Sequence, residues 1–181
     1  MTLTSRQVPA DLRPRATIAA QRLQPDALFR LLAARELHAW LLHDGSLTDR
    51  IGRSCGTVHV RPDRESDGLP SALEAGLLRQ ARRGGWWLRE ITLYAGGTAR
   101  LRARTLVPPC STVLRTRLMG LGSTPLGRVL FRADRLRPEV RRGDRGFYRN
   151  DAGDWLRATA YEVRGEPLLV IERPLPALLR P

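Results

Sequence analysis

An arginine interrupts an apolar row in the segment from Trp86 to Val107. With the period of two that a β-strand imposes, Arg89 shares a face with Ile91 and Leu93. Arginine is almost never fully buried without a partner, and burying an unpaired charge costs several kcal/mol. The row therefore predicts an anion opposite Arg89. The pattern leaves open whether this anion is a side-chain carboxylate or a ligand, or whether the strand turns Arg89 towards water.

Glu172 interrupts a second apolar row, near the end of the chain. In residues 167–173 it shares a face with Leu168 and Val170, again by the period of two. The two exceptions carry opposite charges. One interpretation is that Arg89 and Glu172 neutralise each other. The other is that both side chains face a cavity and act on a molecule between them.

Two turns offer free backbone N–H groups at predicted helix starts. Ser46 can cap a short helical turn that begins at Leu47. Thr124 can cap a helix whose first residue is Pro125, which leaves the N–H of Leu126 near a helix N-terminus. Because the first N–H groups of a helix have no partner within it, both turns are able to bind an anion.

Hydrophobic periodicity and turn signals predict the elements that must position these residues. Gly96-Gly97 suits a two-residue hairpin turn between two strands of the central segment. On the second of these strands, Arg100, Arg102 and Arg104 share one face, which we expect to be solvated. We also expect helices over residues 25–43, 71–82 and 112–119, a strand over 57–61, a loop over 62–70, a mobile connection over 135–154, and a hairpin formed by 155–163 and 167–173.

Composition predicts one globular domain, over residues 25–181, with a flexible arm over residues 1–24. The chain has 181 residues, 42% of them apolar, and a net charge of +13 carried by arginines that are spread along its length. This spread disfavours a nucleic-acid binding stripe and leaves an anionic small molecule as the expected partner. We expect a cytoplasmic protein, because there are only two cysteines, no apolar run of membrane-spanning length and no apolar leader. The expected oligomeric state is a monomer.

Four sequence blocks, in order, resemble the chorismate pyruvate-lyase family, whose members make 4-hydroxybenzoate for ubiquinone. The resemblance extends over roughly residues 25–178, and its blocks are WLLHDGSLT at 40–48, WLREITLYAGGTARLRARTLV at 87–107, LGSTPLGRVLF at 121–131 and GEPLLVIERPLP at 165–176. The WLRE and TPLGR motifs are its most specific parts. Residues 132–154 match poorly.

The resemblance implies a fold, a reaction and a set of site residues. The implied fold is α+β, an antiparallel sheet of about six strands with helices packed around it and an enclosed ligand. The implied reaction is the cleavage of chorismate to 4-hydroxybenzoate and pyruvate, with no metal or organic cofactor. By position, Arg89 and the N–H groups of Leu47 and Leu126 would hold the product carboxylate, and Glu172 would meet the phenolic oxygen. Arg89 and Glu172 are the expected catalytic residues.

Two other classes of function compete with this prediction. The first is a ligand-sensing domain, because effector-binding domains of some bacterial transcription regulators resemble the lyase fold, and fold does not fix function. Such regulators carry a helix-turn-helix module ahead of the sensor, and residues 1–24 are too short and proline-rich to supply one. The second is an arginine-rich nucleic-acid binder, whose affinity would fall steeply with salt.

Overall fold

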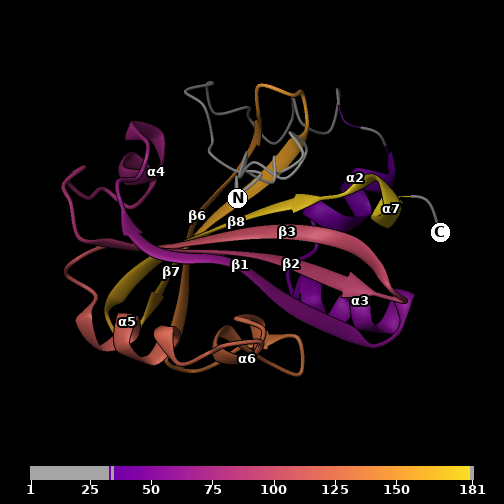
Figure 1. Cartoon of the computed structure of the whole chain (residues 1–181), viewed down its shortest axis with the longest axis horizontal. Helices are drawn as coiled ribbons and strands as arrows, with labels where there is room; N and C mark the ends of the chain where they lie inside the picture. Colours follow the sequence, from indigo (N-terminus) through magenta and orange to yellow (C-terminus); the bar gives the residue numbers. More distant parts are fainter. Residues whose placement is uncertain (1–32, 34, 180–181) are drawn as a thin grey trace, which may run out of the picture.

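The protein is a six-stranded antiparallel sheet with short helices around it (Figure 1). The computed structural model describes residues 33 and 35–179. The strand order is β1-β2-β3-β8-β7-β6. The strands of this sheet are β1 (Val58–Gly68), β2 (Trp86–Ala95), β3 (Thr98–Val107), β6 (Val140–Arg149), β7 (Trp155–Val163) and β8 (Glu166–Pro174), and a separate small hairpin pairs β4 (Phe131–Arg132) with β5 (Arg135–Leu136). The α+β class and the number of strands are confirmed.

The helices divide unequally between the two faces of the sheet. They are α2 (Arg35–Leu41), α3 (Leu47–Cys55), α4 (Ala72–Leu77), α5 (Thr112–Met119), α6 (Gly127–Leu130) and α7 (Pro176–Leu179). On one face, side chains of α5 and α6 share a core cluster with Trp87 and Val107, and α3 packs on Ile91 and Leu93. On the other face, α4 packs against Leu88 and its neighbours. Figure 1 shows α5 and α6 together on one side of the strands and α4 away from them. The face under α3, α5 and α6 is called the inner face below.

The central hairpin forms as predicted. Gly96 and Gly97 connect β2 and β3 with φ values of 59° and 73°, both in the left-handed region that glycine adopts without a steric penalty. The resulting register places Arg89 opposite Thr105. Ile91 and Leu93 lie on the same face as Arg89, because all three line one pocket. The second predicted hairpin, β7 with β8, is also confirmed, and it turns at Arg164 and Gly165.

Three predicted element boundaries are wrong. Residues 62–68 continue β1 as an edge strand instead of forming a loop, with a register shift at Pro62 that accommodates the missing N–H. Most of the predicted mobile connection, 135–154, forms β5 and the edge strand β6. The predicted helix over 71–82 ends at Leu77 as α4, and Arg79 follows with a φ of 53°.

The prediction that Arg104 lies on a solvated face of β3 is wrong. Its side chain is buried, and its guanidinium lies 2.5 Å from Glu90 and 3.2 Å from Glu74. Glu74 also accepts a hydrogen bond from the N–H of Ser71 in the capping box of α4. The helix therefore covers the arginine, and the alternation of strand residues alone could not reveal that cover.

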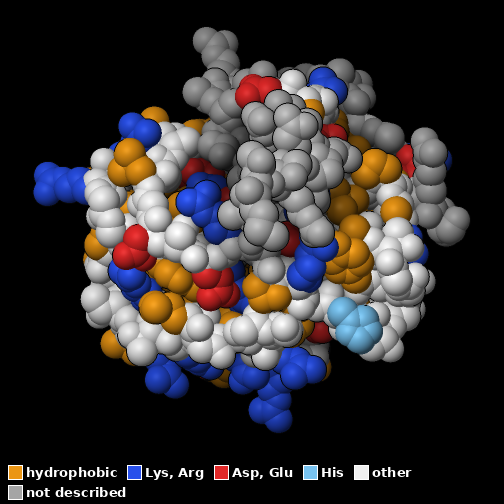
Figure 2. Space-filling model, viewed as in Figure 1, with side chains coloured by type: hydrophobic (Ala, Val, Ile, Leu, Met, Phe, Trp, Pro, Cys, Tyr) orange, Lys and Arg blue, Asp and Glu red, His pale blue; other side chains and the backbone are white. Residues whose placement is uncertain are grey.

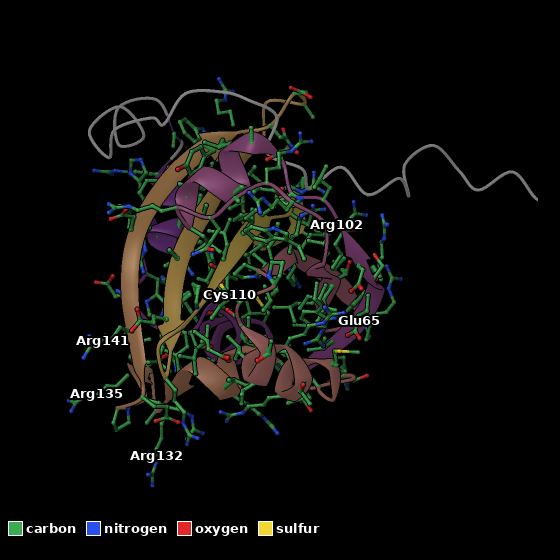
Figure 3. All side chains as sticks on the ribbon, turned by 90° about the vertical axis from the view of Figure 1, so that its left-hand side faces the viewer. Glu65, Arg102, Cys110, Arg132, Arg135 and Arg141 are labelled. Atoms are coloured by element: carbon green, nitrogen blue, oxygen red, sulfur yellow. The ribbon has the colours of Figure 1, made fainter. Side chains whose placement is uncertain are left out.

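Exposed arginines such as Arg132, Arg135 and Arg141 project from the side of the molecule opposite Glu65 (Figure 3).

Some predictions concern residues outside the described part of the chain. The flexible arm over residues 1–24 lies entirely outside it, and of the helix expected over 25–43 only α2 and its neighbours are described. None of the helices in the described part is long and apolar enough to cross a membrane. Within residues 35–179, no group of three or more His, Cys, Asp or Glu side chains is placed to hold a metal ion.

Candidate functional site

A pocket lies on the inner face of the sheet between β2, β3, β8 and the starts of α3 and α6. Its empty space is about 530 Å³, including the part open to solvent. All four residues predicted from the sequence line it: Leu47, Arg89, Leu126 and Glu172. Apolar side chains such as Ile91, Leu93 and Val170 supply most of the remaining wall. The structure therefore brings the predicted residues together around one space.

Arg89 is held in the pocket wall by contacts on its other sides. Its side chain is 2% exposed, and its Nε lies 3.0 Å from a carboxylate oxygen of Glu65 on β1. Its Nη2 donates to the carbonyl oxygens of Gly122 and Thr124, in the loop that leads to α6. No described residue accepts a hydrogen bond from Nη1. Burial lowers the pKa of Arg89, and the negative charge of Glu65 opposes that shift. Among the described residues, the charge partner of Arg89 is thus Glu65, in a stretch for which the sequence predicts a loop.

The turn before α3 has the predicted geometry. α3 begins at Leu47, and the hydroxyl of its N-cap, Ser46, accepts a hydrogen bond of 3.2 Å from the N–H of Asp49. No described residue accepts from the N–H of Leu47 or Thr48, both of which line the pocket. These two donors are the unpaired groups that a helix N-terminus leaves for water or an anion.

The turn before α6 differs in detail from the prediction. α6 begins at Gly127, two residues later than expected, and its N-cap is Leu126 without a side-chain cap. Thr124 is therefore not the N-cap of α6; its N–H donates to the carbonyl of Leu121 at 2.7 Å, in the preceding turn. The N–H of Leu126 still has no acceptor among the described residues, and Leu126 lines the pocket as predicted.

Gly127 allows the two turns to adjoin. A Cβ added at Gly127 would lie 2.9 Å from the hydroxyl oxygen of Ser46 and 3.7 Å from that of Thr48. Only a residue without a side chain permits this approach. The free N–H groups at the two helix starts are therefore placed at the same end of the pocket, where they can act on one bound group.

Glu172 is paired with Arg157, which sequence reasoning missed. Nε and Nη2 of Arg157 lie 2.8 Å and 2.6 Å from Oε2 of Glu172. Nη1 of the same arginine donates to the carbonyl oxygens of Leu41, at 3.3 Å, and His43, at 2.6 Å. The interpretation that Arg89 and Glu172 neutralise each other is therefore wrong: each has its own counter-ion, and both line the pocket.

Tyr161 is a further pocket residue that the sequence did not single out. It is buried, and its ring packs edge-on against Phe131, with the ring centroids 6.2 Å apart. Burial raises the pKa of Tyr161, and the nearby charge of Glu172 raises it further. The hydroxyl is therefore a neutral donor at the Glu172 end of the pocket. The only signal for Tyr161 in the sequence is its position in the strand, where the period of two places it on the same face as Arg157.

Comparison with known proteins identifies the family. The sequence model of the family described as chorismate lyase matches residues 19–178. A protein named chorismate pyruvate-lyase from Serratia proteamaculans (strain 568) is 39% identical over 141 residues, which cover 76% of this chain and 77% of that protein. One of the same name from Erwinia tasmaniensis is 40% identical over 149 residues, 81% and 82% of the two chains.

Solved structures give a weaker likeness. PhnF from Mycobacterium smegmatis has a TM-score of 0.46 and 13% identity, over 74% of this chain and 64% of that one. A GntR-family transcriptional regulator from Enterococcus faecalis V583 has a TM-score of 0.40 and 11% identity, over 65% and 88% of the two chains. These scores are too low to support a functional argument. The family match spans most of the sequence, including all four pocket residues, and the chain belongs to the chorismate lyase family.

Proposed function

We propose that this protein converts chorismate to 4-hydroxybenzoate and pyruvate. The observation that carries the proposal is that Arg89, Glu172 and the N–H-bearing residues Leu47 and Leu126 line a single pocket. Family membership supplies the reaction, and the pocket supplies a cationic group, free amides and a carboxylate on separate parts of its wall.

The ring carboxylate of the substrate binds at the Arg89 end of the pocket. A guanidinium and backbone N–H groups form strong charge-assisted hydrogen bonds with a carboxylate. Arg89 contributes the guanidinium, and the helix starts at Leu47 and Leu126 contribute the amides. Because Arg89 also donates to the carbonyls of Gly122 and Thr124, the arginine and one of the two turns are fixed relative to each other before ligand binds. Such preorganisation reduces the cost of binding.

Glu172 acts at the opposite end of the ring, at the C4 hydroxyl. In the reaction, the C3–O bond breaks, and the hydrogen on C4 is transferred to the methylene carbon of the enolpyruvyl group, which becomes the methyl group of pyruvate. The ring becomes aromatic, and this supplies the driving force. The protein orients a dianion in a largely apolar cavity, a contribution of position and electrostatics. Arg157 holds the Glu172 carboxylate in the orientation that the C4 hydroxyl requires.

We further propose that the enzyme is a cytoplasmic monomer that needs no cofactor and whose product feeds ubiquinone synthesis. Cys55 and Cys110 are free thiols, as expected in a reducing compartment. Size-exclusion chromatography with light scattering measures the molar mass in solution and so tests whether the protein is a monomer.

The experiment that tests the activity is incubation of purified protein with chorismate. We expect 4-hydroxybenzoate and pyruvate to appear in equal amounts, without added metal or nicotinamide. Binding of 4-hydroxybenzoate without any turnover of chorismate would overturn the proposal and favour a sensing domain. Steeply salt-dependent binding of DNA or RNA with no aryl ligand bound would also contradict it.

A further inference from the structure

A cluster of polar groups lies beyond the Glu172 end of the pocket, at the β6 edge of the sheet. Arg145 on β6 is the cross-strand partner of Thr159 on β7, and Arg142 is the partner of Tyr161. A register shift between Arg142 and Arg145 turns both side chains to the same side, and each lies within 3.0 Å of one carboxylate oxygen of Asp44. Without that bulge, residues three apart on a strand would point to opposite faces.

This cluster is on the same face as the pocket. The register aligns Arg145, Thr159, Val170, Thr105 and Arg89 in one row across five strands. Val170, Thr105 and Arg89 line the pocket, so the row continues from the pocket wall to Arg145. Four strand spacings separate the Cα atoms of Arg89 and Arg145, roughly 19 Å along the sheet. This distance can accommodate the side chains of Arg89 and Arg145 with a small dianion bound between them.

Several buried polar atoms of the cluster have no hydrogen-bond partner among the residues that the structure describes. These atoms are Nε and Nη2 of Arg145 and the hydroxyl oxygen of Thr159. Thr159 is 0% exposed, so its hydroxyl cannot reach bulk water. A buried donor or acceptor without a partner destabilises the folded protein. Two adjacent strands on the pocket face therefore carry buried polar atoms to which no described residue gives a partner.

The charges of the cluster call for an anion. Three guanidinium groups, those of Arg142, Arg145 and Arg157, are balanced by two carboxylates, those of Asp44 and Glu172. Asp44 is 81% exposed, so water screens much of its charge. Burial lowers the pKa of Arg145, and the positive charges of Arg157 and Arg142 lower it further, which agrees with an excess of positive charge.

We propose that Arg145, with Thr159, binds the second carboxylate of the substrate, the one carried by the enolpyruvyl group. This inference rests on the proposed function. Chorismate is a dianion, and Arg89 with the two helix starts accounts for its ring carboxylate only. The enolpyruvyl ether is attached next to the carbon that bears the C4 hydroxyl, so its carboxylate lies on the Glu172 side of the ring. Arg145 thereby selects substrate over product, because 4-hydroxybenzoate lacks this carboxylate.

The test uses two ligands that differ only in the second carboxylate. 3-(Carboxymethoxy)benzoate carries a ring carboxylate and an ether-linked carboxylate, as chorismate does, and 3-methoxybenzoate lacks the latter. Calorimetry measures both ligands on the parent protein, on Arg145→Met and on a matched control, Asp44→Asn. We expect Arg145→Met to lower the affinity for the dianion by about 30-fold or more and the affinity for the monoanion by less than about twofold. Asp44→Asn keeps the arginine, so we expect it to change both affinities by less than about threefold.

A second variant tests the hydroxyl group. Thr159→Val keeps the shape of the side chain and removes an oxygen atom that has no partner among the described residues. We therefore expect unchanged or higher thermal stability and an affinity for the dianion that is lower by about threefold to tenfold. Equal losses for both ligands in Arg145→Met would show a structural role, and no loss for either would show that the site holds only water. Both results would overturn the inference. Failure of the parent protein to release pyruvate from chorismate would instead contradict the proposed function, whatever the ligand pair shows.

Discussion

Arg157 and Glu172 are directly opposed on β7 and β8, and Nη2 of the arginine lies 2.6 Å from the carboxylate. The same guanidinium donates to the carbonyl oxygens of Leu41 and His43. Arg157 thus links the carboxylate at one end of the pocket to the segment that leads into α3, whose first N–H groups lie at the other. A change at Glu172 consequently affects both the chemistry and the position of that segment.

Glu172→Gln should lower both turnover and stability. The amide accepts a hydrogen bond from Arg157 but supplies no negative charge, so a buried guanidinium loses its counter-ion. We expect the free energy of unfolding to fall by about 1–3 kcal/mol. Turnover per folded molecule should fall by about 100-fold or more, because the variant has no negative charge to act on the C4 hydroxyl or to oppose developing positive charge. Thermal unfolding and pyruvate release, measured on one preparation, give both values.

Glu162→Gln is the matched control for this change. Glu162 is on the same pair of strands but exposed, so neither quantity should change measurably. If Glu172→Gln unfolds early but turns over normally per folded molecule, Glu172 is only a structural counter-ion.

Arg104→Met should be among the most destabilising single changes on β3. It leaves Glu74 and Glu90 as buried carboxylates without their cation, which costs about 3–5 kcal/mol. Arg102→Met, on the same face of the same strand, should change stability by less than about 0.5 kcal/mol, because no described carboxylate pairs with Arg102. Chemical denaturation measures both. Similar stabilities for the two variants would show that the ion pairs around Arg104 contribute little.

The four predicted pocket residues could be found because each has a local signal in the sequence. Arg89 and Glu172 are charges in apolar strand rows, and a strand fixes which neighbours share a face. Leu47 and Leu126 follow turns that expose backbone N–H groups, a property of the chain direction and not of the side chain. The family resemblance then assigned these positions their roles. Short-range patterns were sufficient, because two hairpins and two turns carry the whole set.

The partners of these residues were not predictable by the same reasoning. Glu65 lies on an edge strand whose sequence is charged and interrupted by proline, so the segment lacks the apolar alternation of a strand. Arg157 and Glu172 meet only through the register of β7 with β8, and Arg104 is buried only because α4 covers it. Strand pairing and the packing of a helix over a strand bring together residues that are far apart in the sequence, so local sequence patterns do not predict them.

Gly127→Ala should weaken product binding and lower stability. The added methyl group would meet the Ser46 hydroxyl at 2.9 Å and push the starts of α3 and α6 apart. We expect the affinity for 4-hydroxybenzoate to fall at least about tenfold, because the free N–H groups lose their common target, and stability to fall by about 1–3 kcal/mol. Gly52→Ala on α3, whose methyl group meets only Val58 at 3.6 Å, should keep the affinity and stabilise the helix by about 0.5–1 kcal/mol. Equal affinities in the two variants would contradict this account of Gly127.

Acidification should destabilise the protein through His43. Burial lowers the pKa of His43 below its ordinary value of 6.5, Arg50 lowers it further, and Asp134 opposes the shift. The unfolded chain therefore takes up a proton below about pH 6.5 that the folded protein does not, and stability falls as the pH decreases in that range. His43→Gln should show a smaller drop in melting temperature between about pH 7 and pH 5 than the parent. Parallel curves for the two proteins would exclude His43 as the source.

Arg89→Ala should abolish useful binding of 4-hydroxybenzoate. The contact between its guanidinium and a carboxylate is charge-assisted and enclosed, and its loss costs about 2–5 kcal/mol, or about 30-fold to several thousand-fold in affinity. Arg89→Lys should also bind poorly, because an ammonium group cannot make a planar two-point contact or hold the loop carbonyls in the same way. Calorimetry with 4-hydroxybenzoate measures both variants.

Glu65→Gln separates the ligand contact from the ion pair that Arg89 already makes. This change removes the carboxylate 3.0 Å from Nε and leaves the arginine in the pocket wall. Since a ligand carboxylate and Glu65 compete for the same positive charge, the variant should bind 4-hydroxybenzoate as tightly as the parent or more tightly. If Glu65→Gln loses as much affinity as Arg89→Ala, the ion pair is what shapes the pocket, and the assignment of Arg89 as the direct carboxylate ligand fails.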